Sequence, residues 1–296
     1  MALTSIPSCP ICSGNEFNSY LRCTDYTASQ EQFTLKKCLT CKFIFTDPRP
    51  DEASLPNYYQ SDNYISHTGG NKSLLDNIYL KARKITLGWK RNLVKKYSGE
   101  NKILDIGCGT GEFLHEMKSH GWSITGVEPS PNARESSKKK TGVEIFKSLS
   151  DVTDNDFNAI TLWHVLEHLP DPNQALRTVH NLLHQSGTIF IAVPNLQSYD
   201  ASYYQSFWAG YDVPRHLWHF DKKNMETLLK KNGLQLVKIL PMHLDSFYVS
   251  LLSESYKHPK RSKLLHLFSA IIIGLKSNIM ARKTLAYSSL IYVVRR

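Results

Sequence analysis

Residues 102–114 of this 296-residue chain have the sequence KILDIGCGTGEFL, and this stretch predicts the fold. The apolar run from Ile103 to Ile106 has the composition of a buried strand, and the glycines after it allow a sharp turn into a helix. The free amides at the start of that helix would face any ligand held above the glycine loop. The stretch therefore predicts a strand, a ligand-binding loop and a helix, which together form the first unit of an open α/β sheet.

Two acidic residues strengthen this interpretation. Asp105 stands near the end of the first strand, and a second predicted strand, residues 123–127, is followed by Glu128, 17 residues after Gly111. An acidic residue at the tip of the second strand is placed to accept hydrogen bonds from both ribose hydroxyls of an adenine nucleoside. The pattern indicates a nucleoside site at one edge of the sheet.

The segments DIGCGTGEFL and GVEPS resemble the cofactor motifs of class I S-adenosylmethionine-dependent methyltransferases, and the resemblance covers about residues 100–240. The loop is G-C-G-T-G rather than the G-x-G-x-x-G of a dinucleotide fold, so it suits a methionine tail rather than a pyrophosphate. The resemblance implies that Asp105 holds the methionine amine and Glu128 the ribose, while Cys108 is a small filler. The residues expected at the cofactor are Asp105, Gly107, Cys108, Gly109, Gly111, Glu128, Pro129 and Trp163.

Four of the six cysteines form two C-x-x-C pairs, Cys9 with Cys12 and Cys38 with Cys41, separated by 25 residues. This spacing is typical of a zinc ribbon, in which two knuckles complete a closed tetrahedral site and the metal is structural. A ribbon that has lost its metal and a redox pair are the alternatives, while a disulfide is disfavoured in a reducing compartment. We expect a structural zinc ion.

The stretch WHVLEHLPDP, residues 163–172, contains H-x-x-E-H, the zinc signature of inverted-motif metallopeptidases. That site needs a long helix, but Pro170 and Pro172 leave room for at most about a turn and a half. The preceding residues 157–163 predict a buried fourth strand, which puts His164 at its carboxyl end, where open α/β sheets bind ligands. The sequence therefore favours an active-site loop over a peptidase helix.

The segment VLEHLPDP also resembles the corresponding part of ubiquinone-biosynthesis O-methyltransferases. The resemblance implies a divalent cation held by an acidic residue three before the E-H pair, but His164 stands at that place here. Three interpretations stay open: a metal at His164, Glu167 and His168; a general-base role for His164 or His168; or a capping and packing role.

Residues 207–220, FWAGYDVPRHLWHF, form a predicted loop dense in aromatic residues and histidine. Loops carry function and large apolar groups avoid water, so we expect this loop to form a substrate wall, with a structural lid as the competing view. His216 and His219 join His164 and His168 as candidate catalytic residues, of which His164 and His216 are the strongest. The segment resembles small-molecule methyltransferases with a preceding cysteine-knuckle domain, including deoxysugar C-methyltransferases.

The predicted fold class is α/β: a Rossmann-like seven-stranded methyltransferase sheet with a small N-terminal zinc ribbon. Residues 1–50 form the predicted ribbon-like domain, and residues 51–99 a connector that contains Tyr58, Tyr59, Tyr64, Gly69 and Gly70 and one or two helices over about 72–97. The methyltransferase domain is expected over 100–296, with a substrate loop at about 196–222 and an apolar, basic insertion at about 245–285.

The net charge of +10 is concentrated at the C-terminal end, because residues 257–296 carry nine basic groups and no acidic group. An anionic partner would meet this region. Its apolar run, residues 264–275, has 12 residues and is too short to span a membrane. It is expected either to be a core helix between the last two strands or to make peripheral contact with anionic lipid through residues 257–285.

The N-terminal residues lack the pattern of a secretory signal, and no uninterrupted apolar run reaches the roughly 18 residues of a membrane span. We expect a cytoplasmic protein, either free or peripheral at the inner membrane face. The sequence does not determine its oligomeric state.

Three functions fit these patterns. The first is an S-adenosyl-L-methionine-dependent methyltransferase that modifies oxygen or carbon of a small molecule, such as a sugar, a quinone-like compound or a lipid-linked acceptor. The second is a zinc-ribbon RNA methyltransferase, but residues 1–60 carry five basic and six acidic groups, whereas a nucleic-acid module should be basic. The third is a binding protein without catalysis, which the intact GCGTG loop and Glu128 disfavour. Nucleic acid is therefore not the expected partner.

Overall fold

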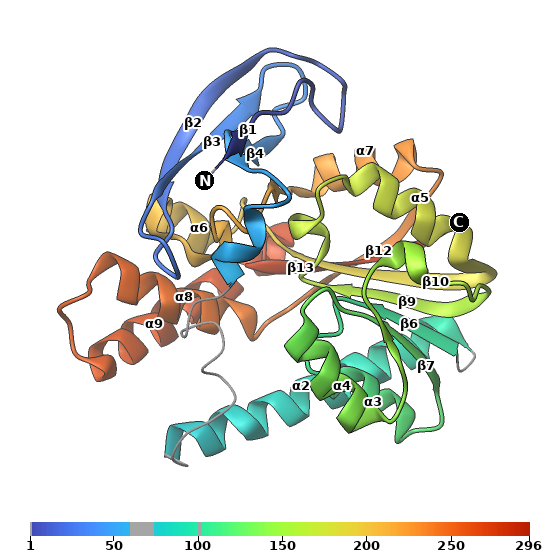
Figure 1. Ribbon diagram of the computed structural model, residues 1–296. Coiled ribbons are helices and arrows are strands. Elements are labelled where there is room, and N and C mark those ends of the chain that lie inside the picture. Colours follow the sequence, from blue (N-terminus) through green and yellow to red (C-terminus); the bar gives the residue numbers. More distant parts are fainter. Residues whose placement is uncertain (1, 60–73, 100–101) are drawn as a thin grey trace.

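The computed structural model describes residues 2–59, 74–99 and 102–296, and its centre is a seven-stranded mixed sheet with the order β12-β13-β10-β9-β6-β7-β8 (Figure 1). Neighbouring strands from β10 to β8 are parallel, whereas β13 is antiparallel to both β10 and β12. This confirms the predicted α/β fold class. The strands are β6 Lys102–Ile106, β7 Ser123–Val127, β8 Ile145–Phe146, β9 Phe157–Trp163, β10 Leu183–Pro194, β12 Gln235–Pro241 and β13 Ser289–Arg295.

Helices cover both faces of the sheet, which is why its central strands are apolar without alternation. All residues of β9 from Phe157 to Leu162 are buried, and β13 is buried from Ser289 to Val294. In Figure 1 one face carries α2 Leu74–Ser98, α3 Glu112–Lys118 and α4 Pro131–Thr141, and the other carries α5 Pro172–Leu182 and α7 Lys222–Lys231. The expected connector residues Tyr64, Gly69 and Gly70, and the predicted helix start at Lys72, lie outside the described residues.

The two prolines after the H-x-x-E-H motif decide its local structure. Only a short 3₁₀ turn, η4 Leu166–His168, forms before them, and α5 then begins at Pro172. Asp171 caps α5, because its side chain accepts hydrogen bonds from the backbone amides of Asn173 and Gln174. The two histidines therefore do not share a helix, and the prediction of a strand end followed by a loop is confirmed.

The N-terminal part forms a second, four-stranded antiparallel sheet with the order β11-β4-β3-β2, of which β2 and β11 were not predicted. Its last strand, β11 Trp218–His219, comes from the aromatic loop and pairs with β4 Ile44–Thr46. The other members are β2 Phe17–Thr24 and β3 Gln32–Cys38, and a separate pair consists of β1 Leu3–Thr4 and β5 Arg49–Pro50. The N-terminal ribbon thus uses a strand that lies about 170 residues away in the sequence.

A continuous apolar core joins this ribbon to the main sheet. Phe43 stacks near Trp218 at 6.2 Å between ring centroids and lies 5.5 Å from Phe220. The same cluster of buried residues includes Cys9 and Cys38 from the ribbon and Leu162 from β9. Because the two sheets share one core, the ribbon is packed directly against the main sheet.

A pair of helices is inserted between β12 and β13. α8 Asp245–Lys257 and α9 Lys263–Thr284 pack on each other and on α6 Tyr199–Tyr204, and they project from the side of the sheet in Figure 1. The apolar run of 12 residues lies inside a longer helix, because α9 extends over 22 residues. By length and composition α9 is able to cross a membrane, with a mean hydropathy of 1.6 and a third of its apolar window buried. The length argument against a membrane span therefore does not hold.

Candidate active site

The glycine loop after β6 leaves open space at its centre. Gly107 and Cys108 donate backbone hydrogen bonds to the Val127 carbonyl at 2.7 and 3.0 Å, which ties the loop to the tip of β7. Gly109 has a φ of 55°, and no atom lies within 4 Å of the position that a Cβ would take there. Gly111 begins α3 with a φ of 82° and lies so close to Ser137 of α4 that a side chain would clash. We call this loop, residues 107–111, the glycine cradle. A ligand can approach its backbone at Gly109, whereas Gly111 is packed against α4.

Glu128 lies at the tip of β7 and faces this cradle. Its Oε2 accepts a hydrogen bond from the Gly109 amide and its Oε1 accepts one from the Ser130 amide, both at 2.9 Å. The side chain is buried, and two amides fix its orientation. Pro129 beside it is exposed, and its carbonyl accepts a hydrogen bond from Arg134. Glu128 is thus oriented before any ligand binds, with further acceptor capacity on each oxygen.

Asp105 is a buried carboxylate at the end of β6. Strand register places it beside Thr161 of β9, whose hydroxyl donates a 2.6 Å hydrogen bond to Asp105 Oδ1. Burial raises the pKa of Asp105 to about 7, although the Thr161 hydrogen bond and the charge of Lys90 act in the opposite direction. An ammonium group placed here would add a positive charge beside the buried carboxylate and favour its ionised form.

Trp163 is the last residue of β9, and Lys90 of α2 lies against its ring. The Lys90 ammonium lies 4.4 Å from the Trp163 ring centroid, and Phe113 contacts the same indole edge-on at 5.6 Å. Trp163 Nε1 is buried and has no hydrogen-bond partner among the described residues, so it offers an unused donor. Burial lowers the pKa of Lys90 against the charges of Asp245 and Asp105. Lys90 lies on α2, and its lysine-rich helical context gave no signal of this position.

The side chain of Cys108 is packed among its neighbours. Its side chain is buried beside Ser137, and burial raises its pKa above the ordinary range for a thiol. A thiol that stays protonated is a poor nucleophile. The surroundings of Cys108 are therefore those of the small filler that the sequence analysis expected.

His164 follows β9 and lies between two carboxylates. Its Nε2 is 3.0 Å from Asp245 Oδ2, and its Nδ1 is 3.4 Å from Glu167 Oε1. Burial opposes the charged form, but Asp245 and Glu167 outweigh it and raise the pKa of His164 to about 9. His164 also has a φ of 58°, which is unusual for a residue with a side chain and fixes its direction. A ring that is protonated at neutral pH suits orientation or charge stabilisation better than proton removal.

His168 and His216 come from different loops and meet at the centre of the site. Their ring centroids are 4.5 Å apart in an edge-to-face arrangement. His168 Nδ1 lies 3.1 Å from the Arg215 carbonyl oxygen and 2.9 Å from the Tyr59 hydroxyl. Because a carbonyl oxygen only accepts, Nδ1 of His168 carries the proton and Nε2 is left as the acceptor. Burial and the nearby His216 lower the pKa of His168 to about 4, which keeps this ring neutral.

His219 lies away from that pair, at the junction with the ribbon. Its Nε2 is 3.0 Å from the Thr46 hydroxyl, which itself donates to the His216 carbonyl at 2.7 Å. Since the Thr46 hydrogen is used on that carbonyl, His219 donates to Thr46. Burial lowers the pKa of His219 to about 3. Of the four candidate histidines, the structure brings His164, His168 and His216 around Glu167 and places His219 in a structural contact.

Arg215 holds the aromatic loop against the ribbon. It is fully buried, and its guanidinium donates to both oxygens of Asp212, to Asp25 Oδ1 at 2.9 Å and to the Tyr58 carbonyl at 2.9 Å. Asp25 in turn accepts hydrogen bonds from three backbone amides of its own turn. The contribution of Arg215, Tyr58 and Tyr59 was not predicted, because the sequence gives no indication that residues 58–59 and 215 are neighbours.

Glu167, His168 and His216 also form a group that could hold a metal ion. Their donor atoms lie within 4.8 Å of one another, and the buried Glu167 oxygens make no hydrogen bond among the described residues beyond the 3.4 Å ion pair of Oε1 with His164. Two imidazoles and a carboxylate are ligands that divalent cations accept. This trio differs from the expected one, because His216 takes the place that the sequence analysis gave to His164.

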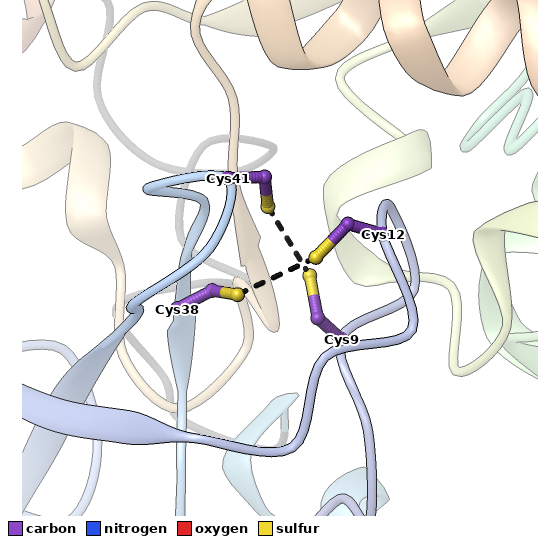
Figure 2. A group of neighbouring side chains, drawn as sticks. All are labelled: Cys9, Cys12, Cys38 and Cys41. Atoms are coloured by element: carbon purple, nitrogen blue, oxygen red, sulfur yellow. Dashed lines mark hydrogen bonds between the residues drawn. The ribbon is translucent and has the colours of Figure 1, made fainter.

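The four predicted ribbon cysteines come together (Figure 2). Their sulfur atoms lie within 4.8 Å of one another, and the Cys9–Cys41 and Cys12–Cys38 sulfur pairs are each 3.5 Å apart. A zinc ion with Zn–S bonds of about 2.3 Å places its ligands about 3.8 Å apart, so the geometry fits a tetrahedral zinc site. Both knuckles have the same turn, in which an amide four residues on donates to the carbonyl of the first cysteine.

The ribbon knuckle is docked on the helices of the main sheet. The Pro10 carbonyl accepts hydrogen bonds from Asn173 of α5 and from Lys231 of α7, at 3.0 and 2.9 Å. A metal at these cysteines would therefore fix the ribbon against the catalytic domain. No position for a substrate is left between four sulfur ligands, so the group is suited to a structural role.

Comparison with known proteins identifies the family. The sequence model of the family described as "Methyltransferase domain" matches residues 79–239, which is more than half of the chain. Curated relatives include the ubiquinone biosynthesis O-methyltransferase of Glaesserella parasuis, 34% identical over 107 residues, and that of Pseudomonas aeruginosa, 31% identical over 104 residues. The matches cover 32% of this chain in each case, and only 45% and 44% of those relatives.

A solved structure shows the same fold. The S-adenosylmethionine-dependent methyltransferase from Archaeoglobus fulgidus matches with a TM-score of 0.50 and 21% identity, over 72% of this chain and 94% of the other. The match to the family, the seven-stranded sheet and the glycine cradle between β6 and β7 agree with one another. The chain therefore belongs to the methyltransferase domain family and has the fold of the S-adenosylmethionine-dependent methyltransferases.

Proposed function

We propose that this protein transfers a methyl group from S-adenosylmethionine to an oxygen or carbon nucleophile of a small-molecule acceptor, in a site between the HVLEH loop (residues 164–168) and the aromatic loop (residues 207–220). The observation that carries the proposal is the contact between these two loops. Leu217 donates its amide to the Glu167 carbonyl at 2.8 Å, and His168 lies against His216. Both loops follow the carboxyl ends of central strands, where ligands bind in this class of sheet.

The cofactor would lie over the glycine cradle. Glu128 is placed to accept from the ribose hydroxyls, and Gly109 leaves room for the ligand to approach the backbone. The paired charges of Asp105 and Lys90 suit an amino acid, because a carboxylate would face the ammonium and an ammonium the carboxylate. Bound there, S-adenosylmethionine supplies an electrophilic methyl group. Trp163 would cover the ligand and lend its unused Nε1 donor.

On the acceptor side, the protein's tasks are to orient a nucleophile and to remove its proton. His168 is the proposed base, because the Arg215 carbonyl fixes the proton on Nδ1 and leaves Nε2 to accept. His216 packs on that ring, and its own Nδ1 donates to the Gly210 carbonyl at 2.9 Å. His164, held in its charged form by Asp245 and Glu167, would orient the acceptor or stabilise negative charge on it.

A labelling experiment tests the function. The purified protein is incubated with methyl-labelled cofactor and fractions of cell extract, and the label is followed into lipid, nucleotide-sugar and RNA fractions. The proposal expects label in a small-molecule or lipid fraction. Label found in RNA would instead support the alternative of a zinc-ribbon RNA methyltransferase. The metal content separates a metal held by Glu167, His168 and His216 from histidine acting as a base, because only the former adds a second metal ion to the one expected at the cysteine group.

Cofactor affinity is expected to increase with pH. The pKa of Asp105 without ligand is raised to about 7, and a bound ammonium would lower it, so binding below pH 7 releases a proton. Affinity should therefore increase about tenfold from pH 6 to pH 8 and change little above that. Calorimetric titration of the wild type and Asp105→Asn checks this, because the amine of the cofactor titrates equally in both. An equal pH slope in the two proteins would contradict the role of Asp105.

One zinc ion per chain is expected at Cys9, Cys12, Cys38 and Cys41. Replacing Cys38 with serine should abolish zinc binding and lower the melting temperature, because the free energy of metal binding contributes to folding. Cys23→Ser is the matched control, since Cys23 is buried in β2 outside the group and should leave the zinc content unchanged. Elemental analysis of anaerobically purified protein gives the answer. Wild-type protein without zinc would overturn the prediction.

A further inference from the structure

The outward face of α9 is mainly apolar from Leu264 to Met280. Large side chains recur at helical spacing on this face and are exposed, with Leu264 79% and Phe268 64% accessible to solvent. The other members are between 42% and 58% exposed, and they are Leu265, Ile271, Ile272, Leu275, Ile279 and Met280. An ordinary surface helix exposes polar and charged residues to water, whereas this face exposes large apolar residues.

The inward face of α9 is small and polar. Its buried residues are His266, Ala270, Ile273, Gly274, Ser277 and Ala281. Ser277 donates a 2.7 Å hydrogen bond to buried Asp200, and Gly274 lies so close to Phe247 of α8 that a Cβ would clash. The facing side of α8 is similar, with Ser246, Ser250 and Ser253 all fully buried. Close packing through small residues with apolar groups outside is the arrangement of helices surrounded by lipid.

Basic residues surround the apolar face, and the sequence from residue 257 onward has no acidic group, although Arg261 lies 3.6 Å from Glu254 of α8. They stand before the helix, on its side and at its end: Lys257, Lys260, Arg261, Lys263, Lys276, Arg282 and Lys283. Lys257 and Lys276 lie over the rings of Tyr203 and Tyr199, at 4.5 and 4.9 Å from the ring centroids. Tyrosine and lysine beside an apolar surface are typical of the membrane–water interface.

The tertiary arrangement favours lying on a bilayer over crossing it. α9 packs along α8, which has 13 residues, and the buried carboxylate of Glu254 on α8 accepts a 3.1 Å hydrogen bond from Tyr204 of α6. Five residues after α9 ends, the chain enters β13, the buried strand next to the edge strand β12 of the main sheet. One face of α9 is thus covered by protein and only the other is available to lipid, which matches an interfacial helix.

From these observations we propose that the outward face of α9 docks on an anionic lipid bilayer, with its apolar side chains below the headgroups and its basic residues against the lipid charge. A second copy of this chain is a poorer occupant, because two such faces would bring their positive charges together. The proposal does not depend on the identity of the acceptor. It has a consequence for the site, since α8 begins at Asp245, which binds His164. The docked surface and the active-site loop are therefore joined by one short helix.

Vesicle co-sedimentation of the 296-residue protein tests the proposal. Vesicles of phosphatidylcholine with about a third phosphatidylglycerol should bind the protein, and pure phosphatidylcholine should bind it much more weakly. Each basic residue near an anionic surface contributes about fivefold to the partition coefficient, so Arg282→Gln with Lys283→Gln should lose about 25-fold. Phe268→Ser, Ile272→Ser and Leu275→Ser combined should lose at least about tenfold, through apolar area no longer buried in lipid.

Val237→Ser is the matched control, because Val237 is an exposed apolar residue of β12 outside the helix pair and should not change binding. All substituted side chains are exposed, so the variants should keep the wild-type melting temperature and cofactor affinity. Equal binding of the triple variant and the wild type to anionic vesicles would overturn the proposal. So would the absence of vesicle binding together with a concentration-dependent dimer that the triple variant abolishes, which would assign the face to a second copy.

Discussion

Replacing His168 with asparagine is expected to lower kcat by about 10²–10⁴ while the cofactor dissociation constant stays nearly unchanged. The Asn side-chain amide can still donate to the Arg215 carbonyl as Nδ1 does, but it has no group at the position of Nε2. The substitution thus removes the proposed base and keeps its anchor. The measurement is a steady-state assay with the acceptor found by labelling, beside calorimetric titration of the cofactor.

His184 of β10, which is half-buried and lies outside the site, provides the control, and His184→Ala should keep wild-type turnover. His219→Gln should affect the melting temperature more than kcat, because His219 donates to Thr46 at the ribbon junction. Near-normal turnover of His168→Asn would show that His168 is not the base. If His216→Ala instead lowered kcat by this amount, His216 would be the base.

The second large effect concerns stability. Replacing Arg215 with alanine is expected to lower the free energy of unfolding by about 3–5 kcal/mol, because the carboxylates of Asp25 and Asp212 would stay buried without their counter-charge. Arg215→Lys should recover only part of the loss, since one ammonium cannot reproduce the two-pronged contact with Asp212 and the bonds to Asp25 and the Tyr58 carbonyl. Urea unfolding curves measure both variants.

Arg177→Ala is the matched control, because Arg177 is exposed on α5 and its removal should change stability by less than about 0.5 kcal/mol. Asp212→Asn introduced into the Arg215→Ala background should cost little more, since it removes one of the carboxylates left unpaired. A cost below about 1 kcal/mol for Arg215→Ala would show that the network does not hold the aromatic loop against the ribbon.

The fold was predictable because its signals are local. In β6, β9 and β13 a run of consecutive apolar residues is enough to indicate a strand buried on both faces, and the glycines at 107, 109 and 111 mark the turn into α3. The position of Glu128 at the tip of the next strand and the meeting of the two cysteine pairs follow from the same short-range patterns. Pro170 and Pro172 likewise exclude a long helix across this segment, because proline breaks the interior of a helix.

Other features depend on contacts between distant segments. The sequence marked four histidines and favoured His164 and His216, but only packing brings His168 against His216, surrounds His164 with Asp245 and Glu167, and turns His219 toward Thr46. The protonation of each ring is set by burial and by which carboxylate or carbonyl lies beside it, and neither can be read from neighbours in the sequence. Lys90 and Tyr59 enter the site for the same reason.

The sequence by itself determined the sheet, the cofactor loop, the cysteine group and the concentration of positive charge after residue 257, because each rests on residue type and short spacing. The tertiary structure alone decided that β11 completes the ribbon sheet, that Arg215 joins the two parts, and that the large apolar residues of α9 face outward. An apolar helix has the same composition whichever face it buries. Which face of α9 is buried is decided by its small and hydrogen-bonding residues, because they pack closely on α8 and bond to Asp200.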